Sequence, residues 1–141
     1  MAPNVRYFPP AISPVWLTQE LLKHYPNYKL SNFSLEDLAK EYIKFWRLVL
    51  SYPEKRVVAP GPIIAVQQVH FAHHEAYFDD CMTYFNRFVL RELVWHGQRD
   101  IRGAVDTVRA YRDLYHELPP PVWQDITAIY NLKIPSLHVV H

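Results

Sequence analysis

Hydrophobic residues recur three or four positions apart in several stretches of this chain, and this spacing predicts amphipathic helices. The clearest stretch begins at Ser34, which together with Asp37 resembles a capping box, and it ends before Pro53. Its charged residues fall mostly on the side of the helix opposite the hydrophobic ones. The hydrophobic side consists of Leu35, Leu38, Ala39, Tyr42, Phe45, Trp46, Val49 and Leu50.

Prolines separate this helix from its neighbours. Ser13 and Pro14 predict a helix start, because serine caps helix N-termini and proline suits the first turn, and Pro26 ends that helix. A long helix is predicted from about Ile63 to Trp95, with room for one break, and another from Ile101 to Tyr115.

The C-terminal part is predicted to be less regular. A short helical turn is expected over 122–130 and an irregular tail from Pro135 onward. Val57 and Val58 are compatible with a short strand, but one such segment does not make a sheet. The pattern therefore predicts an all-α protein, a single domain over 1–141 with four or five helices and a core over about 13–130.

The composition supports one packed domain and excludes several ligand classes. The chain has 141 residues, half of them hydrophobic, with ten tyrosines, seven phenylalanines and four tryptophans, which is enough for a core. It has 12 prolines but only 3 glycines, too few for a glycine-rich phosphate loop or a dinucleotide fingerprint.

The charge and the cysteine content exclude further classes of partner and an internal disulfide. Fifteen Lys and Arg against 14 Asp and Glu give a net charge of +1 without a basic block, so no nucleic-acid partner is expected. No hydrophobic run approaches the ~20 residues that span a bilayer, so no membrane partner is expected. The single cysteine, Cys81, excludes an internal disulfide. We expect a soluble protein of the cytoplasm.

The candidate chemistry lies on the long predicted helix. On a straight helix His70, His74, Tyr77 and Cys81 share one side, in the middle of the buried face, and His73 lies at its edge. A buried polar group without a partner costs on the order of 1–3 kcal/mol, so two buried imidazoles need hydrogen-bond partners, a ligand or a metal.

The main functional hypothesis is a small-molecule site, with acid–base chemistry, in an aromatic pocket lined by histidine. His70 and His74 would exchange protons and Tyr77 would orient one of them, while His73 and Asp80 would form the rim. The predicted ligand-binding residues are Gln67, His73, Asp80, Cys81, Tyr42 and Trp46. Cys81 also fits the simpler interpretation of an inert, buried residue.

Three alternatives remain open. The histidines fit a purely structural role, in which other protein groups satisfy them. Their i,i+4 spacing also allows His70 and His74 to share a divalent metal, with Glu41, His96 or His116 as further ligands. Phe71 stands where the metalloprotease motif needs glutamate, which excludes that motif.

The third alternative is a non-catalytic interaction module, including a homo-oligomer. The many tyrosines and tryptophans support it, because these residues are enriched in protein interfaces. The proline-rich segments 7–10 and 119–121 also suit a partner surface.

Several short segments, in order, resemble the glycine-rich domain-containing protein-like family. The segments are Glu41–Trp46, Ala59–Ile64, the histidine segment Gln67–Cys81, Tyr84–Phe88, Thr107–Tyr111 and Pro119–Trp123. That family's hallmark is Asp, two residues, Trp-His, any residue and His. Here its last histidine corresponds to His70, whereas Ile64, Gln67 and Gln68 replace its Asp, Trp and first His. The resemblance implies an α-helical domain and leaves the chemistry open.

Overall fold

A computed structural model describes residues 12–26, 33–85 and 100–138, with side chains described up to 83 in the second range and up to 132 in the third. The described residues form six α-helices and one short 3₁₀ helix, so the all-α prediction is confirmed and the predicted four or five helices were too few. The elements are α1 (Pro14–His24), α2 (Leu35–Ser51), α3 (Gly61–Ala72), α4 (His74–Phe85), α5 (Ile101–Tyr115), η3 (Pro121–Trp123) and α6 (Gln124–His138).

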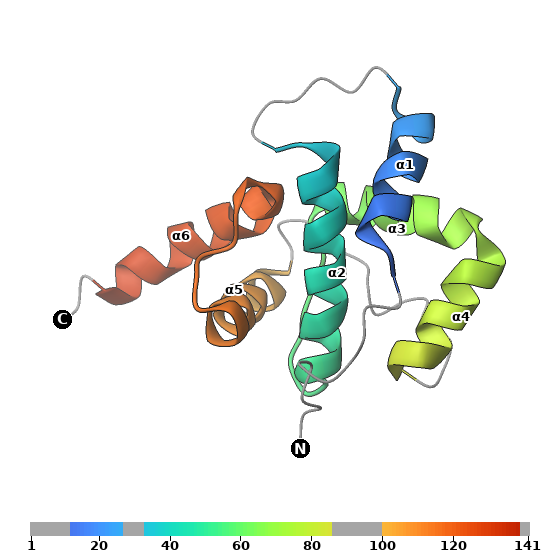
Figure 1. Cartoon of the computed structure of the whole chain (residues 1–141). Helices are drawn as coiled ribbons and strands as arrows, with labels where there is room; N and C mark the ends of the chain where they lie inside the picture. Colours follow the sequence, from blue (N-terminus) through green and yellow to red (C-terminus); the bar gives the residue numbers. More distant parts are fainter. Residues whose placement is uncertain (1–11, 27–32, 86–99, 139–141) are drawn as a thin grey trace.

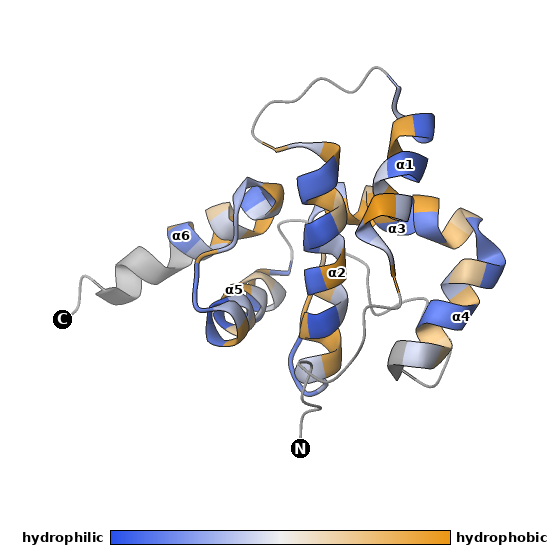
Figure 2. Cartoon of the chain, viewed as in Figure 1, coloured by the Kyte–Doolittle hydropathy of each residue, from blue (hydrophilic) through white to orange (hydrophobic). Residues whose placement is uncertain are grey.

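Helix α2 is the centre of the arrangement. Figure 1 shows α1, α3 and α4 on one side of α2, and α5 and α6 on the other. The side chains of Tyr42, Phe45, Trp46 and Leu48 on α2 are completely buried. Figure 2 shows hydrophilic and hydrophobic patches along α2, in keeping with its amphipathic sequence.

Both predicted helix starts are confirmed. The Ser13 hydroxyl accepts a hydrogen bond from the Trp16 N–H at 3.2 Å, and Pro14 occupies the first position of α1. At α2 the capping box is complete, because the Ser34 hydroxyl accepts from the Asp37 N–H at 3.0 Å and the Asp37 carboxylate accepts from the Ser34 N–H at 3.2 Å. Caps of this kind are local, so the sequence is enough to predict them.

Val57 and Val58, which were compatible with a short strand, are buried in an irregular connector, where the Val58 N–H donates to the Thr107 hydroxyl at 2.9 Å. One expectation about local structure was wrong. The C-terminal helix α6 runs through Pro135 to residue 138, where an irregular tail was expected. Ile126 and Ile129, in the first half of α6, are buried, and α6 packs chiefly against α5.

The described helices include none long and apolar enough to cross a lipid bilayer.

The start of α5 depends on a glycine. Asp100 caps this helix by accepting from the Gly103 N–H at 2.8 Å, and the Arg56 Nε donates to both Asp100 carboxylate oxygens at 2.8 Å. A Cβ at position 103 would lie 2.6 Å from atoms of the Asp100 carboxylate. The capping carboxylate therefore approaches closely only because residue 103 has no side chain.

We expect Gly103→Ala to lower the free energy of unfolding by about 1–2 kcal/mol, because the added methyl group displaces the capping carboxylate. Glycine to alanine inside a helix normally stabilises by up to about 1 kcal/mol, so the expected effect has the opposite sign. Urea unfolding followed by circular dichroism measures it. Arg102→Ala, at an exposed position one residue away, should change stability by less than about 0.5 kcal/mol. A Gly103→Ala protein as stable as the wild type would show that the Asp100 carboxylate can move away from the added methyl group without a loss of stability.

Candidate functional site

His70, in the last turn of α3, is completely buried and has protein partners at both ring nitrogens. The Tyr42 hydroxyl lies 2.8 Å from Nδ1 and the Asp80 Oδ2 lies 2.7 Å from Nε2. Because an ionised carboxylate only accepts hydrogen bonds, the geometry assigns the proton of a neutral ring to Nε2 and makes Tyr42 the donor to Nδ1. We call this set the Tyr42–His70–Asp80 chain; it joins α2, α3 and α4.

Aromatic rings surround the His70 imidazole. The ring centroids of Tyr77, Trp46 and Trp16 lie 4.9, 5.5 and 6.1 Å from that of His70. In this setting burial raises the pKa of the Tyr42 phenol well above its ordinary value. Tyr42 therefore stays protonated at neutral pH and acts as a hydrogen-bond donor rather than as a base.

A second imidazole lies beside this chain and pairs with a carboxylate on α1. The His73 Nε2 is 2.9 Å from the Glu20 Oε1, and the His73 and Trp16 ring centroids are 5.1 Å apart. The His73 side chain is 39% exposed, whereas Glu20 is 10% exposed. Lys23 donates to the Glu20 Oε2 at 2.9 Å, and Lys23 and then His73 hold the Glu20 pKa below its ordinary value. The pair thus consists of a largely buried carboxylate and an imidazole that is accessible to solvent.

The backbone bends at His73, because α3 ends at Ala72 and α4 begins at His74. At the intervening His73 the backbone has φ −93° and ψ 76°, outside the helical region, and its N–H bonds the His70 carbonyl at 3.1 Å. We call His73 and the α1 residues beside it, Trp16, Glu20 and Lys23, the histidine corner.

The bend corrects the expected position of His74. On a straight helix His74 belongs to the middle of the buried face beside His70, but the structure places it at the surface. The break at His73 changes the direction of the side chains that follow, so spacing counted from His70 fails at the first residue of α4. Tyr77 and Cys81, one and two turns further on, are completely buried as expected.

The other predicted site residues are divided between the core and the surface. Tyr42 and Trp46 contact His70, as described, and Gln67 is half-buried on α3. Asp80, predicted to form a rim with His73, bonds His70 instead and is 14% exposed. The buried Cys81 lies close enough to Tyr42 to contribute to the raised pKa of its phenol.

The predicted metal ligands do not meet among the described residues. His70 has protein groups at both nitrogens, His74 lies at the surface, and His96 lies outside the described ranges. Within those ranges no three His, Cys, Asp or Glu side chains are arranged to hold a metal ion. A divalent metal stays a prediction that elemental analysis of the purified protein would test.

Glu41, a candidate metal ligand, belongs to a different cluster, on the α5 side of α2. Its Oε1 accepts from the Tyr111 hydroxyl at 2.7 Å and from the Trp123 indole N–H at 2.9 Å. The Lys44 ammonium lies 3.5 Å from Oε2 and 4.9 Å from the centre of the Tyr115 ring. We call this set the Glu41 cluster; it connects α2 to α5 and η3.

Glu20 and its contact with His73 were missed by the sequence reasoning. One signal was present, because Glu20 follows Leu17 by three positions and precedes Leu21, which places it on the buried side of α1. An acidic residue on the buried side of a helix requires a partner. The sequence does not show which partner it is, because the approach of α1 to α3 and the resulting distance to His73 depend on the tertiary structure.

Comparisons with protein-family models, with curated proteins and with solved structures found no match to this chain. The resemblance to the glycine-rich domain-containing protein-like family therefore stays a prediction.

Proposed function

We propose that the protein binds a small molecule at the histidine corner and exchanges a proton with it through His73. The observation that carries this proposal is the partly exposed His73, which pairs with the largely buried Glu20 and whose ring lies against that of Trp16. A carboxylate that holds one nitrogen of an imidazole, with the ring open to solvent, is an arrangement suited to acid–base chemistry.

Each residue of the corner has a distinct role in this proposal. Glu20 orients the imidazole through Nε2, which leaves Nδ1 as the nitrogen that would meet a ligand. Lys23 keeps the Glu20 carboxylate ionised and in position. The Trp16 ring would provide an apolar wall for the bound molecule.

His70 has a supporting role in the proposed site. Both of its ring nitrogens already bond protein groups, and its side chain has no exposed surface. The Tyr42–His70–Asp80 chain would hold the end of α3 in place and so set the position of His73, three residues further on. His70 is therefore proposed as a positioning residue rather than as the group that exchanges the proton.

Fragment screening tests the proposal. A library of small aromatic acids, amines and amides is screened by saturation-transfer NMR against the wild type and against His73→Gln, with His24→Gln, an exposed histidine of α1, as the matched control. We expect bound fragments whose signals weaken by about tenfold in His73→Gln and persist in His24→Gln, because His73 supplies a direct contact. Fragments that bind both variants equally, or no bound fragment at all, would contradict the proposal.

An interaction module is the second candidate, and exposed apolar side chains on α1 favour it. Val15 and Leu22 are 66% and 55% exposed and lie two turns apart, on one side of the helix. If this side forms a homodimer, sedimentation velocity should show a dimer whose amount rises with protein concentration and that disappears in Val15→Glu/Leu22→Glu. A wild type that remains monomeric at all concentrations would contradict this candidate.

A further inference from the structure

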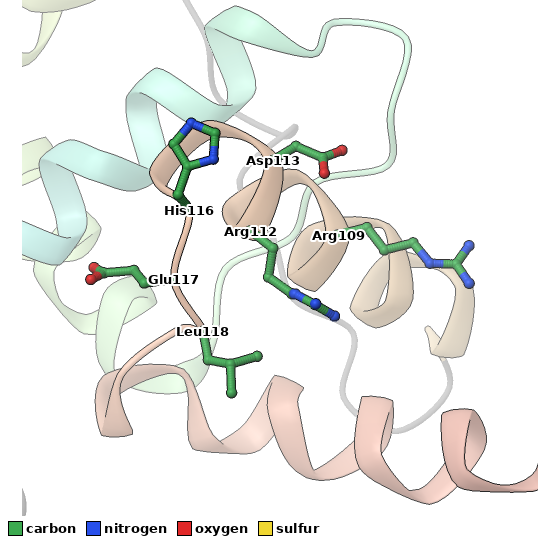
Figure 3. A pocket seen from close by; sticks show the side chains of 6 residues that line it. All are labelled: Arg109, Arg112, Asp113, His116, Glu117 and Leu118. Carbon is green, nitrogen blue, oxygen red and sulfur yellow. The ribbon is translucent and has the colours of Figure 1, made fainter. Parts of the chain in front are cut away.

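A hollow of about 480 Å³ lies at the C-terminal end of α5, on the opposite side of α2 from the histidine corner. Figure 3 shows the side chains that line it, which come from the last two turns of α5 and the segment that follows. The lining residues are Arg109, Arg112, Asp113, His116, Glu117 and Leu118.

Two arginines line this hollow. Arg109 and Arg112 are three residues apart on α5, so they occupy neighbouring positions on the helix surface, whereas His116 follows the end of α5 in a left-handed backbone conformation. Among the described residues, neither arginine forms an ion pair with a carboxylate. One nitrogen of Arg112 donates to the hydroxyl of the buried Tyr130 at 3.2 Å, which positions its guanidinium against α6 without neutralising it.

The two acids of the hollow do not compensate this charge. The Glu117 carboxylate lies 3.3 Å from the Lys44 ammonium, and Figure 3 shows the Glu117 side chain pointing away from both arginines. Figure 3 shows the Asp113 and Arg112 side chains leaving α5 in different directions. The hollow therefore presents two guanidinium groups that have no carboxylate partner in the described part of the chain.

A second hollow, at the start of α5, provides the contrast. It has a volume of about 510 Å³, and it also contains two arginines. Arg56 pairs with Asp100 at 2.8 Å, and the Arg102 Nε lies 4.0 Å from Asp106. Its arginines are thus paired with carboxylates from the protein itself, whereas in the hollow at the end of α5 the two arginines have no carboxylate partner among the described residues.

We propose that the hollow at the end of α5 binds a small organic molecule with two anionic groups, one for Arg109 and one for Arg112. Figure 3 shows the two guanidinium groups apart from each other, so a molecule with two separated charges reaches both. The carbonyl groups at a helix C-terminus repel anions, so the side chains must supply the binding. Guanidinium is suited to this because it binds carboxylate and phosphate through parallel hydrogen bonds.

NMR titration tests this site with glutarate, pyrophosphate and acetate, added at constant ionic strength. We expect saturable shifts of the backbone amides of residues 109–118 with glutarate or pyrophosphate, and a dissociation constant about tenfold higher for acetate. Saturation by glutarate alone assigns the site to dicarboxylates, and saturation by pyrophosphate alone assigns it to phosphates.

Variants distinguish binding at this hollow from a general attraction of anions to positive charge on the protein. Arg109→Gln and Arg112→Gln should each weaken binding by about tenfold. Arg102→Gln, which removes the same charge from the second hollow, should leave binding unchanged. Arg109 makes no described contact with another side chain, so Arg109→Gln keeps the test valid if Arg112→Gln disturbs Tyr130. Shifts that grow linearly with every anion, or an equal loss in Arg102→Gln, would overturn the proposal.

Discussion

Replacing His70 with leucine is expected to lower the free energy of unfolding by about 3 kcal/mol. The leucine leaves the Tyr42 hydroxyl without its acceptor and the Asp80 carboxylate without its donor, and removing one partner of a buried polar pair has a cost of this size. Guanidinium unfolding followed by circular dichroism measures the change.

Two further variants show whether the loss comes from unpaired polar groups. The triple variant Tyr42→Phe/His70→Leu/Asp80→Leu removes the whole chain, so it should recover most of the stability lost in His70→Leu. His74→Leu, at the exposed histidine four residues away, should change stability by less than about 0.5 kcal/mol. A loss below about 1 kcal/mol in His70→Leu would mean that solvent or other groups satisfy Tyr42 and Asp80.

Replacing Glu41 with leucine is the second change for which we expect a loss of about 3 kcal/mol. The buried Trp123 N–H and Tyr111 hydroxyl would lose their common acceptor, and Lys44 would lose one of its two carboxylates. Glu41→Gln keeps an oxygen that accepts from Tyr111 and Trp123, so its loss should be about half as large. Chemical unfolding gives both values.

Glu36→Gln is the matched control for Glu41. Both residues are on α2 and both contact a lysine, but the Glu36–Lys40 pair is exposed to solvent. Exposed ion pairs contribute little, so Glu36→Gln should change stability by less than about 0.5 kcal/mol. Equal effects at positions 36 and 41 would show that the Glu41 cluster stabilises no more than a surface ion pair does.

Features that depend on neighbouring residues were predictable from the sequence. The caps at Ser13 and Ser34 involve residues within one helical turn, and both were confirmed. The buried side of α2 was confirmed only in part, because its predicted residues Tyr42, Phe45 and Trp46 are buried but the charged Glu41 is buried as well. His70, Tyr77 and Cys81 were also correctly placed in the core, although the break at His73 puts the last two on a different helix from His70.

Features that depend on contacts between helices were not predictable. The break at His73 exposes His74, whereas helical spacing alone placed His74 beside His70. Asp80 bonds His70 because α4 folds back toward α3 after that break, and Glu20 reaches His73 because α1 packs against α3.

The order of the residues was sufficient to predict an all-α chain with helices capped at Ser13 and Ser34 and with a histidine in its core. Hydrophobic spacing and capping are sufficient for this, because both act over a few residues. Only the tertiary structure decided which carboxylate each histidine meets, that Glu41 faces α5, and that Arg109 and Arg112 remain without carboxylate partners among the described residues. These pairings depend on how whole helices are oriented, and burial of the entire core determines that orientation.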